Sequence, residues 1–124
     1  GRALTVVKPA KARWTLERDL GTDDDRLKVL EDGGETRLED IDLNFSRLVR
    51  EEYGFTGNDF ESPYGETVHE RSWYREGWKT DIRVRTRMHC DSRNFHIDAD
   101  LDAWHDGERI YCRSWHEKVP RHYV

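Results

Sequence analysis

The side chains of this sequence that could do chemistry are 6 histidines and a run of alternating aspartates. His89 and His96 flank a short turn and could approach each other across one hairpin, while Asp98, Asp100 and Asp102 occupy every second position. Imidazole and carboxylate groups are ligands for Zn²⁺ and Ca²⁺. However, the histidines form no HxH or HExxH pair, and alternate strand residues lie about 6.6 Å apart, too far for one ion to bind all three aspartates. We therefore expect solvated histidines and a cross-strand ladder of ion pairs.

Nucleophilic catalysis finds no support in the sequence. No glycine is followed by serine two residues on, so the Gly-x-Ser-x-Gly motif is absent. Cys112 alternates with Ile110 and is expected to be a small core residue rather than a reactive thiolate. The acidic run 23–25 is expected to be a solvated hairpin tip. We consequently expect no catalytic residue, no cofactor and no metal ligand in this chain.

Two small groups of side chains remain as candidate sites. A tryptophan on a charged strand face usually packs against a neighbouring domain or beneath arginine side chains, which favours an interaction surface. The candidate interaction surface consists of Trp115, Arg113, Arg85 and Trp104. The candidate polar cavity consists of His69, Arg71 and Trp73.

Composition predicts one folded domain over residues 1–124. Hydrophobic residues make up 35% of the 124 residues and charged residues 38%, but 5 Trp, 5 Tyr and 4 Phe supply packing surface that disordered chains lack. The net charge is −5, and the basic residues are interleaved with acidic ones, so we expect no nucleic-acid partner. No apolar run is long enough to span a bilayer, so we expect no membrane partner.

The ends and the cysteines of the chain suggest its context. The chain starts with Gly1 and shows no signal peptide, so we expect a fragment, a processed product or a tagged protein. The 2 cysteines are too few for a disulfide framework and lack zinc-ligand spacing. A reducing, cytoplasmic location is therefore expected.

Period-two alternation predicts the elements that must position these side chains. It recurs between turn residues, and helical periodicity is absent, so we expect an all-β antiparallel meander forming a β-sandwich or open barrel of about eight strands. The expected strands cover about 12–20, 26–31, 35–43, 45–53, 67–75, 78–89, 94–104 and 108–118. Turns are expected at Asp32-Gly33-Gly34, Glu76-Gly77 and Asp106-Gly107, and one long loop at Gly54–Glu66.

The turns also predict which residues face each other in the last three strands. A two-residue turn at Asp106-Gly107 pairs Asp100 with Arg113, Asp98 with Trp115, and Leu101 with Cys112. A four-residue turn at 90–93 pairs Arg83 with Asp100, Arg85 with Asp98, and Val84 with Ala99. The charged face then becomes a ladder of a central acidic strand between basic neighbours.

Two further consequences concern the cysteines and the preceding hairpin. In these registers Cys90 and Cys112 lie about 26 Å apart, at about 3.3 Å per residue, so no disulfide joins them. In the hairpin of residues 67–89, both strand faces carry large side chains, Val68 and Tyr74 on one and Trp73 on the other. The sequence therefore does not show which face is buried, and the register of this hairpin stays open.

Several segments of the chain resemble one enzyme family. They are Trp14–Leu20, the turn at Asp32-Gly33-Gly34 with Arg37 after it, Gly77–Arg87 followed by Phe95-His96, and the ending Trp115–Arg121. Together they resemble the C-terminal β-rich region of the CocE/NonD serine hydrolases, which group cocaine esterase with X-Pro dipeptidyl-peptidases. His122 and the loop Asn58–Tyr64 differ from the family pattern.

The resemblance implies an accessory role. Members carry their Ser/Asp/His triad in an α/β-hydrolase domain, and none of those motifs occurs in this chain. The expected function is a non-catalytic C-terminal accessory domain, whose partners are the hydrolase catalytic domain of the same polypeptide and, as an open possibility, a second copy of the chain. The alternatives are a stand-alone β module that binds a small molecule or carbohydrate through Trp and Arg, and, ranked last, a small enzyme using His, Asp and Arg.

Overall fold

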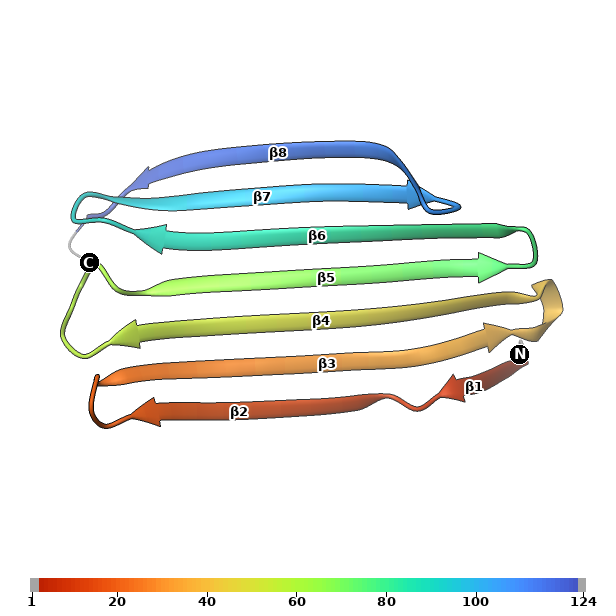
Figure 1. Ribbon diagram of the computed structural model, residues 1–124, viewed down its shortest axis with the longest axis horizontal. Helices are drawn as coiled ribbons and strands as arrows, with labels where there is room; N and C mark the ends of the chain where they lie inside the picture. The colour runs from red at the N-terminus through yellow and green to blue at the C-terminus, as the bar shows by residue number, and fades with distance from the viewer. Residues whose placement is uncertain (1–2, 123–124) are drawn as a thin grey trace.

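The protein is one open antiparallel sheet. A computed structural model describes residues 3–122, and their strands form a sheet in the order β1-β3-β4-β5-β6-β7-β8, with β2 also paired to β3 (Figure 1). The expected all-β antiparallel meander of about eight strands is confirmed, and the sheet does not close into a barrel. The strands are β1 (Leu4–Lys8), β2 (Lys11–Asp19), β3 (Asp24–Leu38), β4 (Leu43–Thr56), β5 (Tyr64–Arg75), β6 (Trp78–Cys90), β7 (Asn94–His105) and β8 (Glu108–Pro120).

The two glycines after Asp32 form a bulge, not the predicted turn. Gly33 and Gly34 both lie opposite Arg47 of β4, so the expected strands 26–31 and 35–43 are one strand, β3, which ends at Leu38 before a short 3-10 helix, η1 (Glu39–Ile41). Gly34 has a φ of +70°, and a Cβ there would lie 2.2 Å from the carbonyl oxygen of Lys8. The bulge lets two short strands pair along the same edge of β3. Strand β2 pairs with the part of β3 that precedes the bulge. Strand β1, which the sequence did not predict, pairs with the part that follows it.

The predicted long loop at Gly54–Glu66 is much shorter than expected. β4 continues to Thr56 and β5 begins at Tyr64, because Gly54 belongs to β4 and Gly65 to β5. A Cβ at Gly54 would lie 2.6 Å from the ring of Tyr64, its partner across the strands. The glycine thus makes room for a tyrosine ring and does not mark a loop.

The two short hairpin turns are confirmed. His105 pairs with Glu108 around Asp106 and Gly107, whose φ angles of 49° and 82° are those of a type I′ turn. Arg75 pairs with Trp78 around Glu76-Gly77, which fixes the register that the sequence left open and brings Glu70 opposite Arg83.

The predicted register of β6 and β7 is wrong by two residues. Arg85 pairs with Asp100, and not with Asp98, because the ladder continues to Cys90 and Phe95. The Asp91 carboxylate closes this turn by accepting the backbone N–H groups of residues 93 and 94 at 2.8 and 2.7 Å. A shift of two preserves the faces, so the arginines and aspartates still share one side.

The predicted register of β7 and β8 is wrong by one residue, which has a larger effect. Ile110 is an extra residue between the pairs Trp104–Arg109 and Ala103–Tyr111, so from there on Asp100 pairs with Ser114. A one-residue shift turns every side chain to the other face. Cys112 is therefore exposed and not a core residue, and it is not bonded to Cys90, which confirms that no disulfide joins them.

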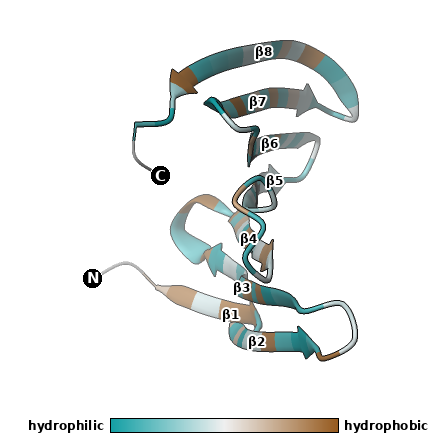
Figure 2. Cartoon of the chain, turned by 90° about the vertical axis from the view of Figure 1, so that its left-hand side faces the viewer, coloured by the Kyte–Doolittle hydropathy of each residue, from teal (hydrophilic) through white to brown (hydrophobic). Residues whose placement is uncertain are grey.

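The sheet is a single layer with very little interior. Figure 2 shows the strands nearly end-on, stacked in one layer. Among the described residues, the buried hydrophobic side chains are Val29, Val49 and Cys90, with 4%, 6% and 8% of their surface exposed. The described chain thus lacks the second layer that usually covers an apolar sheet face.

The bulge at Gly34 should be sensitive to any side chain. Gly34→Ala places a Cβ against the Lys8 carbonyl at a positive φ, and we expect it to lower the free energy of unfolding by about 3 kcal/mol. Gly77→Ala is the matched control, because Gly77 has a φ of +73° but open space around it, and should cost about 1 kcal/mol. Urea denaturation followed by tryptophan fluorescence measures both; equal losses would contradict the role of the Lys8 contact.

Candidate functional site

The candidate site is the side of the sheet that collects the large apolar side chains. Cross-strand pairing places Trp14 and Trp115, at opposite edges, on the same side as Val29. Many of the apolar side chains on this side are open to solvent. For example, 74% of the surface of Leu16 and 65% of that of Trp14 is exposed. We call this side the apolar face; its exposed large hydrophobic residues are Leu4, Val6, Trp14, Leu16, Tyr53, Phe55, Trp78, Met88, Tyr111, Trp115 and Val119.

Charged side chains interrupt the apolar face, most of all on its middle strands, where Glu51 pairs with Val29. Arg47 of β4 pairs in register with Arg71 of β5, and Arg113 of β8 pairs with Leu101. The Arg113 guanidinium lies 4.8 Å from the centroid of the Trp115 ring, a cation–π contact that keeps this cation against an apolar surface. A partner for this face must therefore offer apolar area together with a few acceptors for arginine.

The structure divides the candidate interaction surface between the two sides of the sheet. Trp115 and Arg113 lie on the apolar face, whereas Arg85 and Trp104 lie on the other side, which we call the charged face. There Arg85 Nε contacts Glu66 Oε1 at 2.8 Å, and Trp104 lies 5.9 Å from the guanidinium of Arg109. The expectation that Trp115 shares the Arg/Asp face is wrong because of the extra residue Ile110.

The three residues of the candidate polar cavity share the apolar face. Trp73 and Arg71 line a hollow of about 320 Å³ together with Phe45 of β4 and the bulge at Gly34. His69, opposite Val84, is exposed and does not line this hollow. The hollow is thus an indentation of the apolar face, made by two of the three predicted residues.

The charged face carries the predicted acidic strand, but its contacts differ from the predicted ladder. Among the described residues, no ion pair joins an arginine of β6 to an aspartate of β7. The aspartates contact β8 instead: Ser114 donates to Asp100 at 2.5 Å, and Arg109 Nη2 lies 3.1 Å from Asp102 Oδ1. The carboxylates therefore hold the edge strand β8 in register.

Three histidines lie in a row across β6, β7 and β8 on the charged face. The rings of His89 and His96 stack with their centroids 4.9 Å apart, so the two side chains do approach each other across one hairpin. His116 stacks on His96, with 5.8 Å between the ring centroids. His116 was missed because the predicted register placed it on the other face. The described part of the chain holds no group of His, Cys, Asp or Glu suited to a metal ion.

Two aspartates hold these imidazoles in place. His116 Nδ1 donates to Asp98 at 2.6 Å, and this hydrogen bond holds the pKa of the Asp98 carboxyl below its ordinary value. His96 Nε2 lies 2.8 Å from Asp91, and this bond, with the backbone N–H groups of residues 93 and 94, strongly lowers the pKa of Asp91. Such carboxylates stay ionised and accept hydrogen bonds, so the cluster suits a structural role better than acid catalysis.

The end of β8, within the ending Trp115–Arg121, is fixed by one arginine. Arg121 Nη1 donates to the carbonyl oxygens of Phe60 and Asp91 at 2.6 and 2.8 Å, and its guanidinium lies 5.1 Å from the Phe95 ring. Arg121 thereby joins the end of the last strand to two loops that lie far away in the sequence.

The comparisons with known proteins add no relative. The chain matches none of the family models, curated proteins or solved structures with which it was compared. Among residues 3–122, no helix has the length and apolar character needed to cross a bilayer.

The histidine row gives a testable pH effect. Removing the His116 donor by His116→Ala should raise the pKa of Asp98 toward the ordinary value of 3.8, observable by NMR titration of its side-chain carboxyl carbon. Because the folded-state pKa is lowered, the stabilisation is present above the unfolded pKa and is lost as the pH falls through the folded pKa. The variant should therefore lose less stability than the parent on acidification below about pH 4.

His105→Ala provides the control for this measurement. His105 contacts a different carboxylate, Asp106, at 3.3 Å in the turn between β7 and β8. It should leave the Asp98 titration unchanged, and an unchanged titration in His116→Ala would refute the contact.

Proposed function

We propose that this chain is a non-catalytic accessory domain of a CocE/NonD-like serine hydrolase and packs on the catalytic domain of the same polypeptide through its apolar face. The exposed apolar face on a single-layer sheet is the observation that carries the proposal. Large apolar patches on a protein surface mark contact sites, and full burial of one large aliphatic or aromatic side chain stabilises by about 1.5–3 kcal/mol. Eleven exposed side chains of this kind form the face.

The nature of the partner is supported by the segments that carry the family resemblance. Trp14 and Leu16 of the first segment, and Trp115 and Val119 of the ending, all lie on the apolar face although they occupy opposite edges of the sheet. The large apolar residues of these two segments thus lie on the surface that needs a covering layer, while alternate residues such as Lys118 lie on the charged face. Hydrolase chemistry then belongs to the partner, since this sequence has no Gly-x-Ser-x-Gly motif.

The cellular setting follows from the same proposal. Cys90 and Cys112 are both free thiols, as expected in a reducing compartment, and we place the protein in the cytoplasm. The arrangement leaves the charged face in water, while the apolar face is buried against the catalytic domain.

Activity measurements test the non-catalytic role. The isolated chain should not hydrolyse p-nitrophenyl butyrate or Gly-Pro-p-nitroanilide above the blank, whereas the polypeptide encoded by the complete reading frame should hydrolyse at least one of them. Hydrolysis by the isolated chain would contradict the proposal, as would a complete reading frame that encodes no serine hydrolase domain.

Substitutions on the two faces test the docking surface. Val119→Glu and Leu16→Glu each place a carboxylate on the apolar face, at opposite edges of the sheet, and should weaken binding to the separately expressed catalytic domain about tenfold or more. Isothermal titration calorimetry gives the dissociation constants. Lys118→Glu is the matched control, because it places the same carboxylate one residue away on the charged face and should leave binding nearly unchanged.

Two other outcomes would count against this partner. If the apolar variants bind as tightly as Lys118→Glu, the docking surface lies elsewhere. If size-exclusion chromatography shows a dimer that Leu16→Glu and Val119→Glu dissociate, and the catalytic domain does not bind, the covering layer is a second copy of the chain instead.

A further inference from the structure

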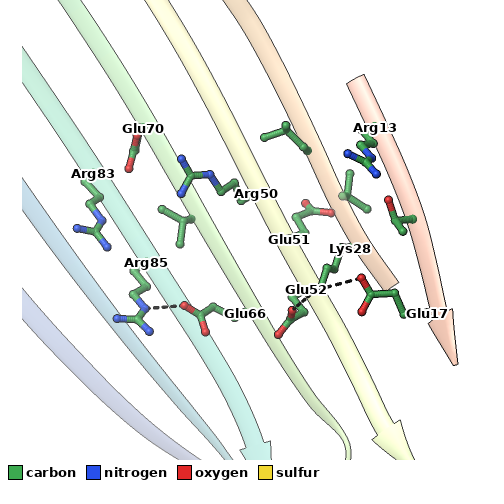
Figure 3. A pocket seen from close by; sticks show the side chains of 14 residues that line it. Arg13, Glu17, Lys28, Arg50, Glu51, Glu52, Glu66, Glu70, Arg83 and Arg85 are labelled. Atoms are coloured by element: carbon green, nitrogen blue, oxygen red, sulfur yellow. Dashed lines mark hydrogen bonds and ion pairs between the residues drawn. The ribbon is translucent and has the colours of Figure 1, made fainter. Parts of the chain in front are cut away.

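The charged face is hollowed over β2 to β6 into an open trough of about 680 Å³ (Figure 3). Its floor includes two aliphatic side chains, Leu30 of β3 and Val68 of β5, and its other lining residues are mostly charged. The trough lies on the side of the sheet opposite the apolar face, so its use does not depend on the proposed function.

At one end of the trough the charges neutralise each other. Lys28 Nζ lies 3.2 Å from Glu17 and 3.9 Å from Glu52, and Arg85 Nε lies 2.8 Å from Glu66 (Figure 3). These side chains are engaged with one another and would have to separate before they could bind a ligand.

At the other end the cations are not neutralised. Arg13, Arg50 and Arg83 make no ion pair within 4.0 Å with any residue that the structure describes. Figure 3 shows the Arg50 side chain reaching from β4 toward Arg83 and Glu70, with Arg13 on the far side. Glu70 pairs in register with Arg83 but forms no ion pair with it, so this end keeps an excess of positive charge.

The spacing of these cations has a regular pattern. Cross-strand pairing gives the row Arg13, Leu30, Arg50, Val68, in which guanidinium and aliphatic side chains alternate from β2 to β5. Adjacent strands lie about 4.8 Å apart, so Arg13 and Arg50 start about 10 Å from each other across Leu30. Such a row suits an anion at each end of an aliphatic segment.

We propose that this end of the trough binds a linear dicarboxylate. One carboxylate lies between Arg50 and Arg83, the aliphatic chain lies over Leu30, and the second carboxylate reaches Arg13. Arginine suits this ligand because its planar donors bind carboxylates in pairs. We use suberate, with eight carbons, as the probe. Because β5 lies about 14 Å from β2, the Arg13 side chain must extend over Leu30 to reach the second carboxylate.

A titration of the full chain with suberate at low salt tests the site. The NMR methyl signals of Leu30 and Val68 should shift and saturate with a single dissociation constant, because their methyl groups form the floor. Octanoate lacks the second anion and succinate lacks the length, so each should bind about tenfold more weakly. Absence of saturation with suberate, or equal affinity for octanoate, would overturn the proposal.

Charge variants give changes of opposite sign. Arg13→Gln and Arg50→Gln should each weaken suberate binding about tenfold, whereas Glu70→Gln should strengthen it about threefold by removing a nearby negative charge. Arg26→Gln is the matched control, since Arg26 lies on the same face, pairs with Gly54 and does not line the trough.

The variants separate specific binding from general attraction to a charged surface. Thermal unfolding of each variant, compared with the parent, shows that the sheet is intact. If Arg50→Gln behaves as Arg26→Gln does, or if Glu70→Gln weakens binding, the dicarboxylate site is refuted. Neither result affects the docking of the apolar face, which the Leu16 and Val119 variants test separately.

Discussion

The β-bulges at Gly33-Gly34 and at Ile110 decide for most of this single sheet which side chains lie on each face. The bulge at Gly33-Gly34 lets β1 and β2 pair end to end along β3, and the extra residue Ile110 turns most of β8 over relative to β7. Because side chains alternate strictly along a strand, one extra residue exchanges the two faces for everything beyond it. The separation of an apolar face from a charged face depends on both bulges.

The separation of faces explains how so polar a chain forms an ordered sheet with almost no interior. Backbone pairing runs from β1 to β8 without a break, and the charged face adds contacts between neighbouring strands, such as those of Asp98 and Asp100 with β8. The apolar face contributes little while it is exposed to water, since hydrophobic stabilisation requires burial. A covering layer would supply what the isolated sheet lacks.

The two faces are independent surfaces with different chemistry. The apolar face combines aromatic and aliphatic side chains with a few arginines, among them Arg113 over Trp115, which is the composition of a protein contact. The charged face holds the trough and the histidine row, both of which stay open to small solutes when the opposite side is covered. In our proposals, one layer of strands therefore carries a docking surface and a binding surface back to back.

The fold class, the approximate strands, the two-residue turn at Asp106-Gly107 and the free cysteines could be predicted from the sequence, because alternation and turn chemistry are local properties. The bulges, the faces on which Trp115 and Cys112 lie, and the contact of His116 with Asp98 follow from the tertiary structure alone. The sequence gives no distinctive signal for either bulge. Ile110 has a residue type common in regular strands, and Gly33-Gly34 would also suit a turn. Its position is set by the pairing of whole strands, in which distant residues must fit one another.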